Sequence, residues 1–260
     1  MAESPQEDLI ITREDSTAVI RLNRPKKLNT MTRSMSEALP GIVREINGDA
    51  SIRAVIIEGA GDKAFSAGSD VKALDDYGSG WEIRNRTEYC RELLAIRKPV
   101  IAAVRGYAIG GGLEIALCAD IRLADPTAKF GAGEIKLGWH GGGGVTQLLP
   151  RLIGAGNAGL LLFTGDIIDA ETAYRMGLVQ ELTEDGKLAD RTRGLAARIA
   201  ANAPIAAEAI KTLLRVSMNA PLDVGLKYEN ETFLTCFNTA DARRGIEAFK
   251  AKEQPRFEGN

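Results

Sequence analysis

A run of three glycines between two apolar segments constrains the fold of this chain more than any other feature. The short segment Val100–Val104 is typical of a buried strand, and the unbranched segment Leu113–Ala119 favours a helix. Gly110, Gly111 and Gly112 lie between them. A strand that turns into a helix here leaves the first helical N–H groups unpaired at the positive end of the helix dipole. Such a junction can hold an oxyanion.

A second glycine turn offers another backbone donor. Gly68, Ser69 and Asp70 also follow a predicted strand, Ala54–Gly59. Two amides that converge on one oxygen form an oxyanion hole, which suits a reaction through an enolate or a tetrahedral anion. The alternative is that both glycine runs are only tight turns between packed elements.

Two glutamates accompany the glycine run. Glu114 lies in the otherwise apolar Leu113–Ala119 segment, so we expect it to be partly buried, and Glu134 follows the predicted strand Ile121–Ala124. Burial raises the pKa of a carboxyl group, and a second carboxyl nearby raises one of the two further. The pair can then hold one proton at neutral pH and supply one acid and one base. The alternative is that each glutamate is a solvated surface residue.

Composition and charge exclude several classes of function. A net charge of −2, without a long basic block, argues against a nucleic-acid partner. No apolar run approaches the ~20 residues that a membrane span needs, and the first residues lack the features of a signal peptide, so a cytoplasmic protein without a membrane partner is expected. Cys90, Cys118 and Cys236 are widely separated and His140 is the only histidine, so neither a disulfide framework nor a metal site is expected.

Strand and helix patterns alternate over the first two thirds of the chain, and helices fill the last third. Strands are expected at Ile10–Arg13, Ala18–Leu22, Ala54–Gly59, Val100–Val104, Ile121–Ala124 and Leu178–Leu182. Helices are expected from a cap at Thr32 to Ile46, at Arg84–Ile96, Leu113–Ala119, Val145–Ile153, Ala158–Thr164 and Ala170–Met176, and over most of the chain after Leu188. Gly59, Gly61 and Ala64 match a dinucleotide fingerprint, but a turn rather than a helix is expected at Phe65–Asp70.

Several motifs taken together resemble the enoyl-CoA hydratase/isomerase (crotonase) superfamily over almost the whole chain, and most closely its enoyl-CoA hydratases. They are Arg24–Asn29, Phe65–Asp70, Lys98–Val104, Gly106–Glu114, Cys118–Asp120, Phe130–Gly138 and Thr164–Val179. The resemblance implies an α/β superhelix of repeated ββα turns over residues 1–195 and a helical trimerisation region over residues 196–260. It also implies a homotrimer or a dimer of trimers.

The resemblance further implies a set of functional residues. The amides of Ser69 and Gly111 would polarise the thioester carbonyl of an acyl-CoA, Glu114 would deprotonate water for addition at the β-carbon, and Glu134 would protonate the α-carbon. No cofactor is implied, because coenzyme A is part of the substrate. The residues that the resemblance places on the substrate are Lys26, Lys27, Leu28, Ala67, Ser69, Asp70, Val71, Gly111, Trp139, His140, Phe249 and Lys252. In the family, positions corresponding to Phe249 and Lys252 reach the CoA of a neighbouring subunit.

One loop departs from the hydratase pattern. Trp139, His140 and Gly141 stand where relatives commonly have aliphatic residues followed by a proline, beside the acyl pocket. We hypothesise that His140 assists catalysis or binds a polar acyl group, the alternative being an exposed or packing histidine. Hydration of a 2-enoyl-CoA is the leading interpretation because both glutamates are present. The alternatives are a related acyl-CoA isomerase or carbon–carbon hydrolase, and a non-catalytic CoA-binding scaffold.

Overall fold

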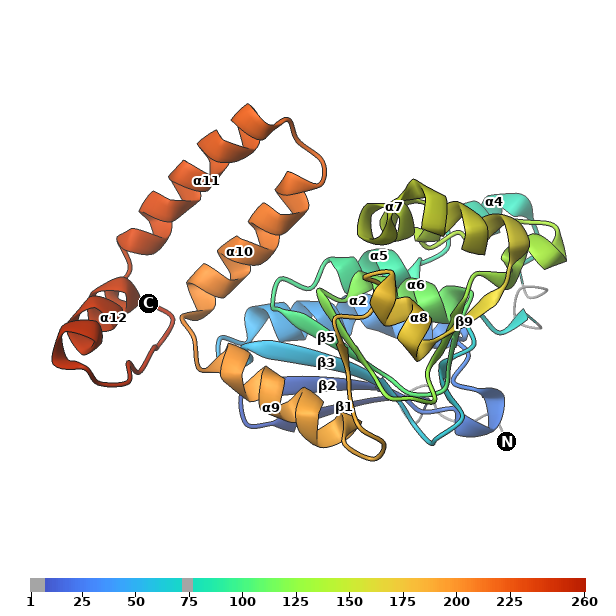
Figure 1. Cartoon of the computed structure of the whole chain (residues 1–260), viewed down its shortest axis with the longest axis horizontal. Helices are drawn as coiled ribbons and strands as arrows, with labels where there is room; N and C mark the ends of the chain where they lie inside the picture. The colour runs from blue at the N-terminus through green and yellow to red at the C-terminus, as the bar shows by residue number, and fades with distance from the viewer. Residues whose placement is uncertain (1–7, 72–76) are drawn as a thin grey trace.

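Six strands form the larger of two sheets in the computed structural model, which describes residues 8–71 and 77–260 (Figure 1). Their spatial order is β1 (Leu9–Glu14), β2 (Thr17–Leu22), β3 (Ala54–Gly59), β5 (Val100–Val104), β7 (Ile121–Ala124) and β10 (Glu181–Leu182). The strands β1 and β2 form the expected antiparallel hairpin, with Leu9 opposite Leu22, and the remaining neighbours are parallel.

The smaller sheet has four strands, and most of them directly follow a strand of the larger sheet in the chain. Its order is β4 (Ala64–Ser66), β6 (Tyr107–Ile109), β8 (Lys129–Gly131) and β9 (Ile167–Asp169), of which only β9 runs antiparallel to its neighbour. Successive pairs β3–β4, β5–β6 and β7–β8 are each followed by helical segments. The predicted α/β class with repeated ββα turns is therefore confirmed.

Alternate residues of the central strands face two different cores, as the two-residue period of a strand requires. Val55 and Ile57 of β3 pack into the main core, which lies between the large sheet and the helices. Ala54 and Ile56 face the opposite side, where they pack against α9. The helices around the main core are α2 (Arg33–Gly48), α5 (Tyr89–Leu94), α6 (Gly111–Cys118), α7 (Val145–Thr164) and α8 (Ala170–Arg175). The helix α9 (Leu188–Ala200) covers the other face of the large sheet.

Helix α6 lies at the centre of the body and is buried along its whole length. A helix that is apolar on every side belongs in a core, and the sequence of α6 is apolar except for Glu114. It packs against α5, α7, β4 and β6. A Cβ placed on Gly112 would lie 1.9 Å from the carbonyl oxygen of Ser66, so only glycine permits this approach. The start of α6 is thereby pressed against the strand that leads to Ser69.

A buried arginine forms hydrogen bonds at the C-terminal end of α6. Arg122 is 2 % exposed, and its guanidinium donates to the carbonyl of Ala119 at 2.6 Å, to the carbonyl of Leu178 at 2.7 Å and to Oε1 of Gln180 at 2.9 Å. Burial lowers the pKa of Arg122 to about 10. The group therefore remains charged at neutral pH and ties the C-terminal end of α6 to the segment before β10.

We expect Arg122→Met to lower the free energy of unfolding by about 3 kcal/mol, because it leaves several buried carbonyl groups without a donor. Arg175→Met is the matched control, since Arg175 is exposed and, among the described residues, its guanidinium bonds only to the hydroxyl of Thr172. Urea unfolding of both variants measures the difference. Equal midpoints for the two variants would contradict the role given to Arg122.

The last helices form an arm that projects away from the sheets (Figure 1). They are α10 (Pro204–Ser217), α11 (Leu222–Phe237) and α12 (Ala240–Ala251). The arm is anchored by Lys211 of α10, which is 4 % exposed and pairs with Asp120 at 2.7 Å. No helix within residues 8–71 and 77–260 has the length and apolarity to cross a membrane. The predicted division after residue 195 falls inside α9 and stays a prediction.

The structure corrects several element boundaries. The helix predicted at Arg84–Ile96 is shorter: α4 (Gly80–Arg84) ends where it was expected to begin, and α5 starts only after Glu88, which caps it by accepting from the N–H of Arg91. The predicted turn at Phe65–Asp70 begins inside strand β4, so a strand rather than a helix comes directly after Gly61, and the dinucleotide fingerprint fails as expected. The strand predicted at Leu178–Leu182 pairs only at Glu181–Leu182.

The glycine run also lies one element later than predicted. The strand Val100–Val104 does not lead into the helix directly, because the short strand β6 comes between them. Gly110, with a φ of 58°, makes the turn from β6 into α6 in a conformation that favours glycine. The two helices predicted at Val145–Ile153 and Ala158–Thr164 are confirmed as the two halves of α7, which meet at non-helical backbone angles at Gly154.

Candidate active site

Two backbone segments meet where the sequence predicts an oxyanion hole. Gly68 has a φ of 90°, and a Cβ placed on it would lie 2.7 Å from the amide nitrogen of Gly111. The chain before Ser69 is thus in contact with the N-terminus of α6. Within the described part of the chain, the N–H groups of Ser69 and Gly111 donate to no carbonyl or side chain. Both are therefore available to a ligand oxygen.

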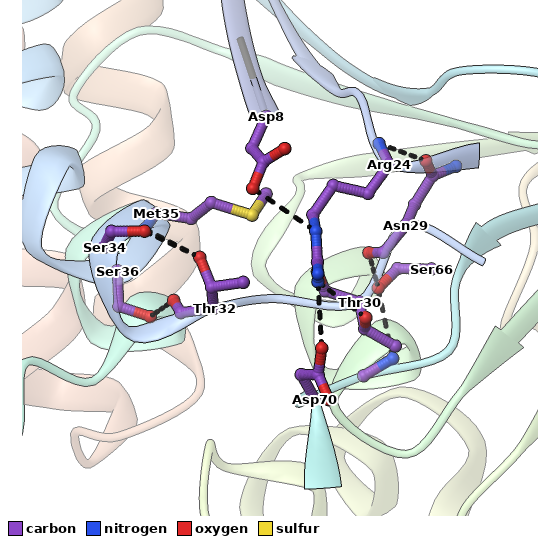
Figure 2. Close-up of polar contacts among 11 residues, drawn as sticks. Asp8, Arg24, Asn29, Thr30, Thr32, Ser34, Met35, Ser36, Ser66 and Asp70 are labelled. Atoms are coloured by element: carbon purple, nitrogen blue, oxygen red, sulfur yellow. Dashed lines mark hydrogen bonds and ion pairs between the residues drawn. The ribbon is translucent and has the colours of Figure 1, made fainter. Parts of the chain in front are cut away.

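A polar network holds the segment that carries Ser69 (Figure 2). The guanidinium of Arg24 pairs with Asp8 at 3.3 Å and with Asp70 at 3.2 Å, and it donates to the carbonyl of Thr30 at 2.8 Å. The hydroxyl of Ser66 donates to the carbonyl of Asn29 at 2.8 Å. These bonds fix the loop that starts at Arg24 against the loop that leads to Asp70.

Asn29 completes this network from a left-handed conformation with a φ of 55°, which asparagine tolerates better than most residues. It is fully buried, and its side-chain amide donates to the carbonyls of Ala60 at 2.9 Å and Ala64 at 2.7 Å. Backbone bonds from Met31 to Gly68 (2.8 Å) and from Asp70 to Met31 (2.9 Å) complete the alignment. The N–H of Ser69 is consequently held in place before any ligand binds.

Glu114 is buried in the first turn of α6, as predicted, and is 3 % exposed. Its Oε1 accepts from the N–H of Gly143 at 2.8 Å and from the N–H of Val145 at 3.2 Å. The glycine loop before α7 therefore orients the carboxylate. A Cβ on Gly143 would lie 2.6 Å from Oε2 of Glu114, so this close approach requires glycine or a shift of the loop.

Glu134 faces the same space from η2, the 3-10 helix Gly133–Leu137. A Cβ placed on Gly141 would lie 2.6 Å from Oε1 of Glu114 and 3.2 Å from Oε1 of Glu134. The two carboxyl groups thus border one niche. The other oxygen of Glu134, Oε2, is buried and has no hydrogen-bond partner in the described residues. An unpaired buried oxygen of this kind suits a protonated carboxyl group or a ligand contact.

The pKa values of both carboxyl groups are raised. Burial raises the pKa of Glu114 to about 7, against the lowering effect of its two backbone donors, and the charge of Glu134 raises it further. Burial also raises the pKa of Glu134, while its own backbone N–H and the charge of His140 lower it. The pair can therefore hold one proton near neutral pH.

The residues predicted to line the CoA path lie together beside the oxyanion hole. The N–H of Ala67 donates to the carbonyl of Leu28 at 2.9 Å, which brings the exposed residues Lys26, Lys27 and Leu28 next to the Ser69 segment. The carboxylate of Asp70 is engaged by Arg24. Val71 is 56 % exposed at the end of the described segment.

Phe249 and Lys252 lie elsewhere in the single chain. Phe249 is on α12 and is 85 % exposed, and Lys252 ends that helix in a left-handed conformation. Figure 1 shows α12 at the far end of the C-terminal arm from α6. The chain by itself therefore does not bring these two residues to Glu114, and their contact with the CoA of a neighbouring subunit stays a prediction.

Trp139 and His140 follow Glu134 on an exposed stretch of the loop. The N–H of Trp139 donates to the carbonyl of Glu134 at 3.3 Å, and Nδ1 of His140 lies 2.8 Å from the carbonyl oxygen of Gly141. The charge that His140 carries when protonated lowers the pKa of Glu134. The structure therefore places His140 close enough to influence the carboxyl pair.

We expect His140→Ala to move the alkaline limb of the kcat/KM profile to higher pH. Without the charge of His140 the pKa of Glu134 rises, so Glu134 keeps its proton over a wider range. The profile is measured by initial rates on a 2-enoyl-CoA, with His140→Gln as a neutral control of similar polarity that should show the same shift. An unmoved profile in both variants would exclude His140 from the chemistry.

Two residues that the sequence analysis did not single out also border the site. The hydroxyl of Tyr89 lies 3.0 Å from Oγ of Ser69, and a Cβ on Gly111 would lie 2.0 Å from it. Nη2 of Arg86 would lie 3.1 Å from a Cβ on Gly142. Both residues lie at or just before the start of α5, where the sequence shows only ordinary helical periodicity, so no local signal marks them.

Two unpaired backbone amides beside one buried and one half-buried carboxyl group, on an α/β superhelix, are suited to an enzyme that stabilises an enolate and moves protons. The sequence profile of the enoyl-CoA hydratase/isomerase family matches residues 12–260. The chain belongs to the enoyl-CoA hydratase/isomerase family.

Individual relatives match the chain over nearly its full length. The crotonyl-CoA hydratase of Syntrophomonas wolfei is 37% identical, covering 96% of this chain and 98% of that protein. The short-chain-enoyl-CoA hydratase of Clostridium acetobutylicum is 38% identical, covering 95% and 96% respectively. The crystal structure of an enoyl-CoA hydratase from Bacillus anthracis superposes with a TM-score of 0.93 at 34% identity, covering 97% of this chain and 100% of that one.

Proposed function

We propose that this protein is an enoyl-CoA hydratase that adds water across the 2,3 double bond of a 2-enoyl-CoA thioester. The observation that carries the proposal is the niche at Gly141, which both Glu114 and Glu134 border next to the paired amides of Ser69 and Gly111. A hydratase needs one group to take a proton from water and another to deliver a proton to carbon. Two carboxyl groups with raised pKa values at one site meet that need.

In this mechanism the thioester carbonyl oxygen accepts hydrogen bonds from the N–H groups of Ser69 and Gly111. Glu114 takes a proton from water as the water oxygen bonds to C3. The electron pair of the double bond moves towards the carbonyl, and the resulting enolate charge is held by the two amides. Glu134 then gives its proton to C2, which restores the carbonyl. The reaction requires no cofactor, since coenzyme A is carried by the substrate.

Crotonyl-CoA tests this function directly. We expect the purified protein to consume it with loss of the absorbance of the conjugated double bond, and to form 3-hydroxybutyryl-CoA identified by mass spectrometry. Formation of an isomer of unchanged mass would instead favour an isomerase. No turnover of crotonyl-CoA or of longer 2-enoyl-CoA thioesters would refute the proposal.

The CoA moiety and the oligomer complete the proposal. The segment Lys26–Leu28 together with Ala67 lines the adenine and pantetheine path, and Trp139 lies at the acyl end.

The arm exposes large apolar side chains, including Phe233, Phe237 and Phe249 with exposed fractions of 57%, 54% and 85%. This exposure supports their burial between subunits of a homotrimer or a dimer of trimers. In that assembly Phe249 and Lys252 contact the CoA bound to a neighbour, and the reaction takes place in the cytoplasm. Light scattering of the purified protein distinguishes a monomer from these assemblies.

A further inference from the structure

Arg86 lies between the oxyanion hole and the glycine loop that orients Glu114. It precedes α5, its side chain is half-buried, and it lines one pocket together with Ser69, Tyr77 and Tyr89. Its Nη2 would lie 3.1 Å from a Cβ on Gly142, the residue before the one that donates to Glu114. The guanidinium therefore borders the space between the Ser69 segment and the glycine loop.

Among the described residues no carboxylate pairs with Arg86, unlike Arg33 and Asp70 at the same pocket, which both have ionic partners. Arg33 pairs with Glu37 at 2.8 Å, and Asp70 pairs with Arg24 at 3.2 Å. Nη1 of Arg86 donates to the carbonyl of Ile83 at 2.7 Å. Arg86 makes no ion pair with any carboxylate within residues 8–71 and 77–260. A half-buried guanidinium in this state is a ready partner for an anion.

The space next to Arg86 continues outward, away from the hole. A cavity of about 250 Å³ shares Arg33, Tyr77, Arg86 and Thr87 with the inner pocket and extends to Trp81 and Asn85. Its carboxylate Glu82 accepts from the N–H of Gly78 at 3.3 Å. The outer cavity therefore leaves room for an acyl group larger than crotonyl, with Arg86 at its inner end.

We propose that Arg86 binds a carboxylate at the distal end of the acyl group, so that the enzyme prefers 2-enoyl-CoA thioesters that carry a second carboxylate. This inference rests on the proposed hydratase function and specifies its substrate class. The planar guanidinium can form two parallel hydrogen bonds with a carboxylate, which selects for charge and for position together. Because Nη1 is held by Ile83, the group is already oriented before the substrate binds.

The test compares three thioesters with the intact enzyme: (E)-glutaconyl-CoA, its neutral methyl ester and crotonyl-CoA. We expect kcat/KM for glutaconyl-CoA to exceed that for the ester by ~10-fold or more, as for a charge-assisted hydrogen bond. Arg86→Gln should bring this ratio close to one, whatever its effect on crotonyl-CoA turnover, and Arg86→Lys should retain part of the ratio. Arg33→Gln is the matched control, since it removes a charge from the same pocket that is already paired with Glu37.

Each outcome separates this inference from the function on which it rests. Equal kcat/KM for glutaconyl-CoA and its ester in the wild type would overturn the inference while crotonyl-CoA turnover still supports the hydratase. An equal loss on all three thioesters in Arg86→Gln would also overturn it, because Arg86 would then support the fold or the CoA moiety. No turnover of any of the three by the wild type would refute the hydratase function itself.

Discussion

Glu114→Gln and Glu134→Gln are each expected to slow the hydration of crotonyl-CoA by at least ~100-fold, the usual contribution of a positioned acid or base. Glutamine keeps the size of each side chain and can still accept hydrogen bonds, including those from Gly143 and Val145. It cannot take or give the proton. Rates are measured at saturating substrate, and the two effects should not add in the double variant, because both groups act on one reaction. Unchanged rates in both single variants would exclude the assigned roles.

A stability measurement shows that such a loss of rate is not caused by unfolding. Glu114 has an ordinary pKa of 4.5 and a pKa of about 7 in the folded chain, so over this range the folded state keeps a proton that the unfolded state releases. The free energy of unfolding therefore falls as the pH rises from 4.5 to about 7. Above that range it is lower by about 3 kcal/mol than at low pH. Glu114→Gln removes this cost, so we expect the variant to be more stable than the wild type at pH 8.5 and nearly equal to it at pH 5. A difference that does not depend on pH would contradict a raised pKa.

Gly111→Ala is expected to lower kcat/KM by ~100-fold or more, the scale of losing a donor of an oxyanion hole. The added Cβ would lie 2.0 Å from the hydroxyl of Tyr89 and 3.2 Å from Cα of Gly68. Tyr89 is only 7 % exposed and is held by Ser69, so it has little room to move. The amide of residue 111 or the Ser69 segment must shift instead, and the two donors then no longer converge on one oxygen.

The double variant Gly111→Ala with Tyr89→Phe tests this cause. Tyr89→Phe removes the hydroxyl that the new Cβ would strike and leaves the ring carbon at 3.2 Å, a contact that a small shift relieves. We expect the second substitution to restore at least ~10-fold of the lost rate, a coupling that pairs of residues in contact commonly show. Tyr89→Phe alone is the control for any part that the hydroxyl itself plays. Loss of the same size with and without Tyr89→Phe would contradict a steric origin.

The fold and the centre of the site could be predicted from the sequence because their signals are local. Glu114 stands alone among apolar residues, so its burial follows from its neighbours, and Gly110–Gly112 marks the start of a helix whatever precedes it. The exact order and bounds of the short elements were harder to predict from the sequence. The strand β6 has three residues, too few for a periodic pattern. The helix α5 begins after a cap at Glu88, a residue type that is equally common inside helices.

The parts of the site that could not be predicted depend on contacts between distant segments. Gly143 orients Glu114 from 29 residues away, and Tyr89 reaches Ser69 across 20 residues. Neither contact can be recognised from the local sequence around its residues. The same holds for Arg86, whose importance comes from the absence of a carboxylate partner in the described residues rather than from any motif.

A crystal structure of the enzyme with a saturated or 3-oxo acyl-CoA analogue measures the arrangement itself. We predict that the thioester carbonyl oxygen lies within ~2.7–3.1 Å of the amide nitrogens of both Ser69 and Gly111, as in other oxyanion holes. Glu114 should then face C3 and Glu134 should face C2. A carbonyl bound away from these amides, or an acyl chain that contacts only one of the two carboxyl groups, would contradict the account.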